Sequence, residues 1–154
     1  MKMKYGMIKL KSLRNEDIPQ IIAWESERET KDFIIPYSYD KHLRNMSDPA
    51  FIYLSIVENN TMIGFIILVL DDDGTSVEFR RIVLARKNKG RGQKAVTLME
   101  KYCKTELKRT RIWLDVFDYN EKARHIYDKL GYKQFDRTAF DGRTLLLYEK
   151  ELRS

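Results

Sequence analysis

The strand–helix–strand pattern of residues 76–117 constrains the fold more than any other feature of the sequence. Ser76 to Leu84 is rich in β-branched and aromatic residues, which is typical of a buried strand. A helix is predicted from about Gly92 to Leu107, because apolar residues recur there at three- and four-residue steps. Arg111 to Phe117 is again a strand. Two strands joined through a helix lie parallel in one sheet, with a right-handed crossover.

Turn signals on both sides of this unit predict antiparallel hairpins. Asn59-Asn60 and Asp141-Gly142 accept the positive φ angles that tight turns between strands need. We therefore expect an α/β fold: a mixed, mostly antiparallel sheet of six to seven strands, with helices on both faces and a central parallel β-α-β unit. The other expected strands are 5–13, 51–58, 62–70, 132–139 and 144–151; the other expected helices are about 17–27 with Asn15 as N-cap, a short one near 41–46, and 121–130 between Asn120 and Gly131.

The charge of the chain indicates an anionic partner. Lys and Arg number 29 against 23 Asp and Glu, which gives a formal charge of +6 over 154 residues. Cys103 is the only cysteine, so no internal disulfide is possible. Residues 1–10 alternate charged and apolar side chains, unlike a signal peptide or a membrane span. We expect a single domain over residues 1–154, located in the cytoplasm.

A basic, glycine-containing segment lies between the first strand of the parallel unit and its helix. It reads Lys87-Asn88-Lys89-Gly90-Arg91-Gly92-Gln93-Lys94. The two glycines allow a tight turn and a close approach of the backbone to a ligand. The helix that follows adds unpaired N–H groups and the positive end of its dipole. A phosphate or pyrophosphate fits this arrangement, and an ordinary surface turn is the other interpretation. The segment lacks the Gly-Lys-Ser/Thr of a Walker loop and the third glycine of a dinucleotide fingerprint.

This segment resembles the pyrophosphate loop of the GNAT superfamily of N-acetyltransferases, whose pattern is Gln/Arg-x-x-Gly-x-Gly/Ala. The pattern falls on Lys87-x-x-Gly90-x-Gly92, with lysine in the first position. Residues 77–84 and 111–117 resemble the fourth and fifth strands of that family. Asn120-x-x-Ala123-x-x-x-Tyr127-x-x-x-Gly131-Tyr132 is similar to the family's helix motif. The closing hairpin is like that of the ribosomal-protein and spermidine N-acetyltransferase branch.

The resemblance implies an acyl-CoA N-acyltransferase fold and transfer of an acetyl group from acetyl-CoA to a primary amine in a ternary complex. It also implies that the fourth and fifth strands splay apart and that the pantetheine arm pairs with the backbone of the fourth. The residues it assigns to the coenzyme are Ile82, Val83, Leu84, Lys87, Asn88, Lys89, Gly90, Arg91, Gly92, Gln93, Asn120, Ala123 and Tyr127.

The resemblance assigns Tyr127 as the general acid that protonates the departing coenzyme A sulfur. A phenol with a pKa of ~10 keeps its proton at neutral pH. Its spacing also places Tyr127 on an apolar helix face, so a purely structural role is the alternative. Glu78 matches a position where related enzymes carry a general base, with a surface ion pair as its alternative role. Asp115, between Trp113 and Phe117 on one strand face, is the other candidate base.

The acceptor is not determined by the sequence. Trp24, Glu25, Phe33, Tyr37 and Tyr39 fall in the region that covers the acceptor site in the family, and they fit equally well as packing residues. Related enzymes modify protein N-termini, polyamines, amino sugars, antibiotics and amino acids.

Two other functions compete with catalysis. One is a non-catalytic acyl-CoA-binding or regulatory domain of the same fold, which the presence of Tyr127 together with Asn120 disfavours. The other is a small basic nucleic-acid-binding module, but no recognised DNA or RNA motif accompanies the positive charge. No metal is expected, because no His, Cys or carboxylate spacing suits zinc. The sequence does not determine the oligomeric state; the resemblance makes a homodimer one possible state, because dimers are common in the family.

Overall fold

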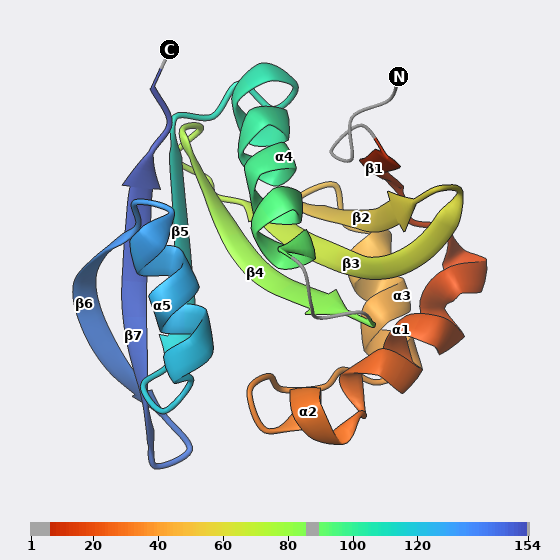
Figure 1. Ribbon diagram of the computed structural model, residues 1–154, viewed down its shortest axis with the longest axis horizontal. Coiled ribbons are helices and arrows are strands. Elements are labelled where there is room, and N and C mark those ends of the chain that lie inside the picture. The colour runs from red at the N-terminus through yellow and green to blue at the C-terminus, as the bar shows by residue number, and fades with distance from the viewer. Residues whose placement is uncertain (1–6, 86–89, 154) are drawn as a thin grey trace.

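The computed structural model describes residues 7–85 and 90–153, which form a seven-stranded sheet in the order β1-β2-β3-β4-β5-β7-β6 (Figure 1). Only β4 and β5 pair in parallel; the other neighbours are antiparallel. The strands are β1 (Ile8–Ser12), β2 (Phe51–Glu58), β3 (Thr61–Leu70), β4 (Ser76–Leu84), β5 (Arg111–Phe117), β6 (Lys133–Phe140) and β7 (Arg143–Glu151). The helices are a 3-10 turn (Asn15–Asp17), α1 (Ile18–Glu25), α2 (Arg28–Lys31), α3 (Tyr39–Met46), α4 (Arg91–Thr105) and α5 (Glu121–Lys129). This is the mixed α/β fold that the sequence predicts.

The two hairpin turns have the backbone conformation that their sequences require. Asn59 and Asn60 have φ angles of 52° and 68°, and Asp141 and Gly142 have φ angles of 52° and 75°. Asparagine, aspartate and glycine occupy this left-handed region at lower cost than other residues. The prediction of both turns is confirmed, and with it the antiparallel register of the strands they join.

The prediction that Asn15 caps the first helix is wrong. Asn15 lies inside a 3-10 turn, and Arg14 is the extended residue before it. The Asp17 carboxylate accepts the backbone N–H of Arg14 at 3.1 Å, so the acidic side chain of the turn caps it from within. The α-helix then begins at Ile18, with Pro19 in its first turn, where the missing N–H costs nothing.

The segment after α1 is more regular than expected. A four-residue helix, α2, was not predicted, because so short a segment has no apolar periodicity to detect. The next helix, α3, begins at Tyr39 rather than near residue 41. The Ser38 hydroxyl accepts the backbone N–H of Lys41 at 3.1 Å and caps it.

The sheet has a hydrophobic core on each face. On one face α4 buries Ala95, Val96, Met99 and Cys103 against the strands, and the side of α5 adds partly buried residues. On the other face α1 packs its Ile21 and Trp24 against β2, β3 and β4. Figure 1 shows α4 and α5 on the same side of the sheet, with α1 and α3 behind it. None of the described helices is both long and apolar enough to cross a bilayer.

Two irregularities in β4 distinguish it from its neighbours. Opposite Ile67 and Leu68 of β3 lie Arg81 and Phe79, so Arg80 is an extra residue, a β-bulge. The parallel ladder with β5 extends only from Ser76↔Arg111 to Glu78↔Trp113, although both strands continue well beyond it. From that point β4 and β5 diverge, as Figure 1 shows, and the predicted splay is confirmed.

Candidate active site

The divergence of β4 and β5, called here the strand split, leaves one side of each strand without a ladder partner. On β4 the split exposes the backbone that runs from the bulge to Leu84, and on β5 that of residues 114–117. Such an opening lies at the carboxyl ends of two parallel strands, where α/β sheets commonly bind ligands. A backbone edge inside a fold that is left without a protein partner is suited to pair with an extended ligand.

Tyr127 reaches the split from α5. Its ring packs edge-on against Phe79 of β4 and against Tyr132, with ring centroids 6.1 Å and 5.7 Å apart. Within the described part of the chain, Arg81 Nε is the single fully buried side-chain polar atom without a partner. The Tyr127 hydroxyl makes no hydrogen bond to the described residues either, and its oxygen is not fully buried. Burial of the ring, and to a smaller extent the charge of Asp115, raise the pKa of Tyr127 above that of a free phenol. The hydroxyl therefore stays protonated and available as a proton donor.

Glu78 lies at the point where the two strands separate, and its carboxylate is already paired. Arg80 donates to it from Nε at 2.9 Å and from Nη2 at 2.6 Å, a two-point contact. The pKa of Arg80 is raised, chiefly by this bond to Glu78. Both side chains are largely buried, with 10% of the Glu78 and 28% of the Arg80 side chain exposed. Arg80 thus occupies one acceptor site on each oxygen of Glu78.

Asp115 stands across the split on β5. Its side chain is exposed, and no ion pair or hydrogen bond of its carboxylate occurs among the described residues. Partial burial of the carboxyl, followed by the negative charge of Glu78, raises the pKa of Asp115, while Arg80 and Arg81 oppose that shift. Three ionisable side chains of different character, Glu78, Asp115 and Tyr127, are thus brought together at one opening.

The predicted phosphate segment lies partly outside the described residues: Lys87, Asn88 and Lys89 are not among them. Gly90 precedes α4 with φ of 74°, the left-handed conformation that glycine allows. The first bond of the helix runs from Lys94 N to Gly90 O, so the N–H groups of Gly92 and Gln93 have no acceptor within the helix. A Cβ on Gly92 would lie 3.4 Å from Leu84, which ties the start of α4 closely to the end of β4.

Arg91 differs in role from the neighbouring backbone groups. Its Nε donates to both oxygens of Glu58, at 3.0 Å and 3.1 Å, so the guanidinium is directed toward the end of β2. The sequence pattern contained no signal for this long-range pair. The N–H groups of the helix start, rather than the Arg91 side chain, are therefore the better candidates to hold a phosphate.

Asn120 and Ala123 form the first turn of α5. The Asn120 Oδ1 accepts the Ala123 N–H at 3.3 Å and caps the helix, as predicted. Ala123 is partly buried against the core and lies one turn before Tyr127. The cap therefore fixes the start of the helix that carries the candidate acid.

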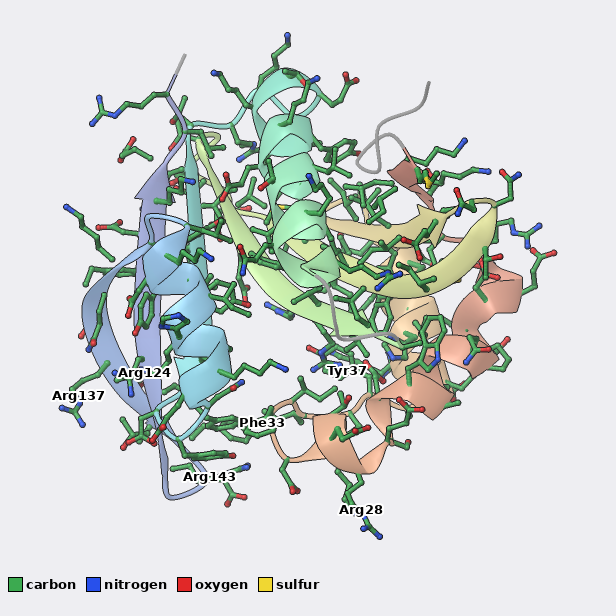
Figure 2. The ribbon with its side chains drawn as sticks, in the orientation of Figure 1. Arg28, Phe33, Tyr37, Arg124, Arg137 and Arg143 are labelled. Atoms are coloured by element: carbon green, nitrogen blue, oxygen red, sulfur yellow. The ribbon has the colours of Figure 1, made fainter. Side chains whose placement is uncertain are left out.

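The residues proposed for the acceptor region divide into two groups. Trp24 and Glu25 of α1 are buried and do not reach solvent, whereas Phe33 and Tyr39 are exposed, at 38% and 46%. Phe33 lies 5.9 Å from the ring of Tyr119, between β5 and α5, and the Tyr119 hydroxyl donates to Asp32 O at 2.6 Å. Figure 2 shows Phe33 and Arg143 approaching each other beneath α5, and Arg143 Nη1 lies 3.3 Å from the Tyr119 hydroxyl.

Sequence reasoning missed the two arginines of the β4 bulge. Arg80 holds Glu78, and Arg81 is buried in a second polar cluster with Glu25 and His42. The available signal was the Arg-Arg dipeptide inside an otherwise apolar strand, since a buried cation requires a partner. Among the residues described here, no group of three His, Cys, Asp or Glu side chains is gathered as a metal site would be.

A groove of about 770 Å³ lies away from the split, between α4 and the last strand. Lys101 and Lys104 of α4 face Glu149 and Arg153 across it. It contains neither the candidate acid nor a candidate base, and its charged side chains are those of an ordinary surface. The unpaired strand edge, the helix start and the free hydroxyl all lie at the split instead, and these are the features that fit a long, phosphate-bearing thioester.

Comparison with protein families gives a match to the model described as "Acetyltransferase (GNAT) family" over residues 16–132. No curated protein matches the chain. Among solved structures, spermidine N-acetyltransferase from Vibrio cholerae in complex with CoA and spermine has a TM-score of 0.82 at 21% identity, covering 96% of each chain. A dodecameric structure of spermidine N-acetyltransferase from the same organism has a TM-score of 0.78 at 20% identity, covering 96% of this chain and 95% of that one. At this level of identity the likeness shows a shared fold.

Proposed function

Since the chain belongs to the acetyltransferase (GNAT) family and is therefore an acetyl-CoA-dependent N-acetyltransferase, we propose that the strand split is its active site. The observation that carries the proposal is the end of the β4–β5 ladder at Glu78 and Trp113, next to which the ring of Tyr127 packs against Phe79 of β4. Acetyl-CoA supplies an activated acetyl group as a thioester. The amine acceptor approaches from the side of Glu78 and Asp115.

We propose that the coenzyme binds to residues of β4, the start of α4 and the start of α5. The backbone of Ile82, Val83 and Leu84 offers unpaired groups to the pantetheine arm, and the N–H groups of Gly92 and Gln93 offer donors to a pyrophosphate. The other proposed coenzyme residues are Lys87, Asn88, Lys89, Gly90, Arg91, Asn120, Ala123 and Tyr127.

The protons of the reaction need one donor and one acceptor. As the amine nitrogen bonds to the acetyl carbon and the carbon–sulfur bond breaks, the nitrogen must lose a proton and the sulfur must gain one. Tyr127 holds its proton firmly and donates it to the sulfur. A carboxylate on the acceptor side takes the proton of the nitrogen, and the solvent then restores both groups.

Of the two candidate carboxylates, we propose that Asp115 is the better placed base and that Glu78 is held by Arg80. Asp115 is accessible and its pKa is raised. A general base works best when its pKa lies near the working pH, so the raised pKa makes Asp115 a better base than an ordinary aspartate. Glu78 is largely buried and already accepts two hydrogen bonds from Arg80.

The pH dependence of the rate discriminates between these carboxylates. Asp115→Asn is expected to lower kcat about 100-fold and to remove the acidic limb of the pH–rate profile. Glu78→Gln is expected to keep that limb, because in this proposal Glu78 does not take the proton of the amine. The substitution weakens only the contact between residue 78 and Arg80. The reverse pattern would assign Glu78 as the base.

The charges around the split also bear on the acceptor. Glu78 is paired with Arg80 and Glu25 with Arg81, so of the three described carboxylates Glu25, Glu78 and Asp115, Asp115 is the one without an ion pair that can balance an ammonium group. A polyamine carries several positive charges and needs several such partners. We therefore propose an acceptor with a single primary amine near its reacting end. Spermidine and spermine serve as the compounds for comparison, because a similar structure was solved with spermine.

An amine panel tests the proposed function. Release of free thiol from acetyl-CoA is measured with spermidine, spermine, simple monoamines, amino acids, amino sugars and a peptide with a free N-terminus. We expect amine-dependent release with at least one compound and formation of its N-acetyl derivative in equal amount. Tight CoA binding without release for any amine class would instead support a non-catalytic acyl-CoA-binding domain.

We also propose that this single domain works in the cytoplasm as a homodimer. The edge strand β6 supports self-association, because it is exposed along its whole length and carries Phe135 and Phe140, each 42% exposed. Sedimentation of the protein over a range of concentrations checks this expectation, and a monomer at all of them would contradict it.

A further inference from the structure

A polar cluster is buried beneath the acceptor side of the strand split. Glu25 of α1 and His42 of α3 are fully buried, and 5% of the Arg81 side chain on β4 is exposed. Burying charged groups is costly unless each finds its partners. The cluster takes no part in the proton transfers proposed above, so its presence inside the core calls for another explanation.

The Glu25 carboxylate organises the cluster. Its Oε2 accepts a hydrogen bond from Arg81 Nη1, and its Oε1 accepts one from His42 Nε2 at 2.8 Å. The same Oε1 receives the backbone N–H of Tyr37 in a longer contact of 3.4 Å. One buried side chain therefore joins α1, α3, β4 and the segment that follows α2.

The far side of His42 closes the hydrogen-bond chain. Its Nδ1 lies 2.8 Å from the hydroxyl of Tyr53, which also accepts from Asn45 Nδ2 at 3.1 Å. With Nε2–H donating to Glu25, His42 Nδ1 can accept the proton of the Tyr53 hydroxyl, so Glu25, His42, Tyr53 and Asn45 all have hydrogen-bond partners. Arg81 Nε alone has no partner among the described residues, and the remaining hydrogen bonds make the cluster a connected support.

Arg81 connects this support to the segment between α2 and α3. Its Nη2 donates to the carbonyl oxygen of Ile35 at 2.6 Å, and its guanidinium lies 4.2 Å from the centre of the Tyr37 ring. Residues 32–38 form no helix or strand of their own. Their position therefore depends on contacts with the rest of the protein. Arg81 and Glu25 supply three of these, two hydrogen bonds and one cation–ring contact.

Tyr37 extends the contact to the split itself. Figure 2 shows Tyr37 close to the open end of β4. After Glu78, Tyr37 is a further group that raises the pKa of Arg80, the partner of Glu78. Tyr37 is half-buried, and its ring contacts Arg81 and His42, with the His42 ring centroid 5.3 Å away. The Tyr37 side chain is thus supported from below by the buried cluster and remains partly exposed.

We propose that the buried Glu25–Arg81 pair positions residues 35–37, and Tyr37 above all, as the wall against which the acceptor amine binds. The inference rests on the proposed function, because it assumes that the acceptor enters on this side of the split. Arg81 and Glu25 are positioning residues: they act through Tyr37 and touch no reacting atom. Buried ion pairs contribute little net stability compared with apolar packing, which agrees with a positional role.

Arg81→Lys is the central test, with Arg109→Lys as its matched control. Lysine keeps the charge but cannot bond Glu25 and Ile35 O at once. Arg109 is also largely buried and donates to the carbonyl oxygens of Asp71 and Ser76, at 2.9 Å and 3.2 Å, at the paired end of the β4–β5 ladder rather than at the split. The two substitutions therefore remove comparable contacts at different places.

The expected results separate the two variants by location. In Arg81→Lys, amide hydrogen exchange of residues 32–38 is expected to increase at least tenfold, and KM for the best amine of the panel to rise about tenfold. The dissociation constant for CoA is expected to stay within twofold, because CoA lies on the other side of the opening. Arg109→Lys is expected to leave all three quantities within twofold of the wild type.

Three outcomes would overturn the proposal. They are unchanged exchange and KM in a folded Arg81→Lys protein, equal loss of CoA and amine binding, and the same changes in Arg109→Lys. If Arg81→Lys does not fold, Tyr37→Ala removes the ring but keeps both partners of the Glu25–Arg81 hydrogen bond, and it is expected to raise the amine KM by a similar factor; an unchanged KM would then refute the inference. Failure of the wild type to acetylate any amine would contradict the proposed function, and the exchange of residues 32–38 would still decide the positioning claim.

Discussion

Substitution of Tyr127 by phenylalanine separates catalysis from stability in this protein. The Tyr127 hydroxyl makes no hydrogen bond within the described residues, while its ring packs against Phe79 and Tyr132. Phenylalanine keeps these ring contacts, so the free energy of unfolding should change by less than about 0.5 kcal/mol. Loss of a general acid costs a factor of roughly 10² to 10⁴ in rate, or about 3–5 kcal/mol of transition-state stabilisation.

Tyr132 provides the matched control for this experiment. It is the neighbouring tyrosine, and its buried hydroxyl donates to Glu100 at 2.9 Å. Tyr132→Phe loses that bond and should destabilise the protein by about 1–2 kcal/mol, since Glu100 keeps its contact with Lys150 at 3.0 Å. For a domain of this size the melting temperature should fall by roughly 2–4 °C per kcal/mol. Its kcat should remain within about twofold of the wild type.

The assay is thiol release from acetyl-CoA at saturating concentrations of both substrates, together with calorimetric CoA binding and thermal unfolding of each variant. We expect Tyr127→Phe to bind CoA normally, melt normally and turn over slowly. We expect Tyr132→Phe to turn over normally and melt early. A Tyr127→Phe enzyme with kcat within threefold of the wild type would refute Tyr127 as the acid, whatever its stability.

Three further predictions concern the fold. Gly64→Ala should destabilise the protein by more than 2 kcal/mol, because the new Cβ would lie 2.3 Å from the carbonyl oxygen of Val83; a urea midpoint close to that of the wild type would contradict this. The Cys103 thiol is fully buried and its pKa is raised to about 12, so a thiol reagent should label it only after unfolding, and rapid labelling of the native protein would be the opposite result. Burial raises the pKa of Tyr53 from 10.0 to about 12. The neutral phenol of Tyr53 therefore contributes fully to the free energy of unfolding below pH 10, and this contribution declines by about 2 kcal/mol as the pH rises toward 12. Urea unfolding of Tyr53→Phe over the same pH range should not show this loss.

The regular elements were predictable from the sequence because their signals are local. Strand bounds at 51–58, 76–84 and 111–117 agree with the structure, since each is a dense apolar run between turn residues. Positive φ at Asn60 and Gly142 follows from residue type alone. The start of α1 was misjudged because Asn15 and Asp17 both carry capping side chains, and the competition between them is decided by geometry.

The site was predictable only where a motif spans neighbouring residues. The motif around Tyr127 identified the residue, but the opening that surrounds it arises from the end of a ladder between strands far apart in sequence. Glu78 and Arg80 are two residues apart on one strand and can share a face, but the bulge at Arg80 that distorts this strand has no signal in the sequence. The cluster of Glu25 and His42 joins positions 17 residues apart. Such contacts leave no periodicity in the sequence.

Amide hydrogen exchange with and without saturating CoA tests the central claim, that the strand split holds the coenzyme. We expect protection of residues 82–84 and of the first turn of α4, with no change along the edge strand β6. Protection confined to the groove between α4 and the last strand, around Lys101, Lys104 and Arg153, would contradict the account, as would unchanged exchange at residues 82–84.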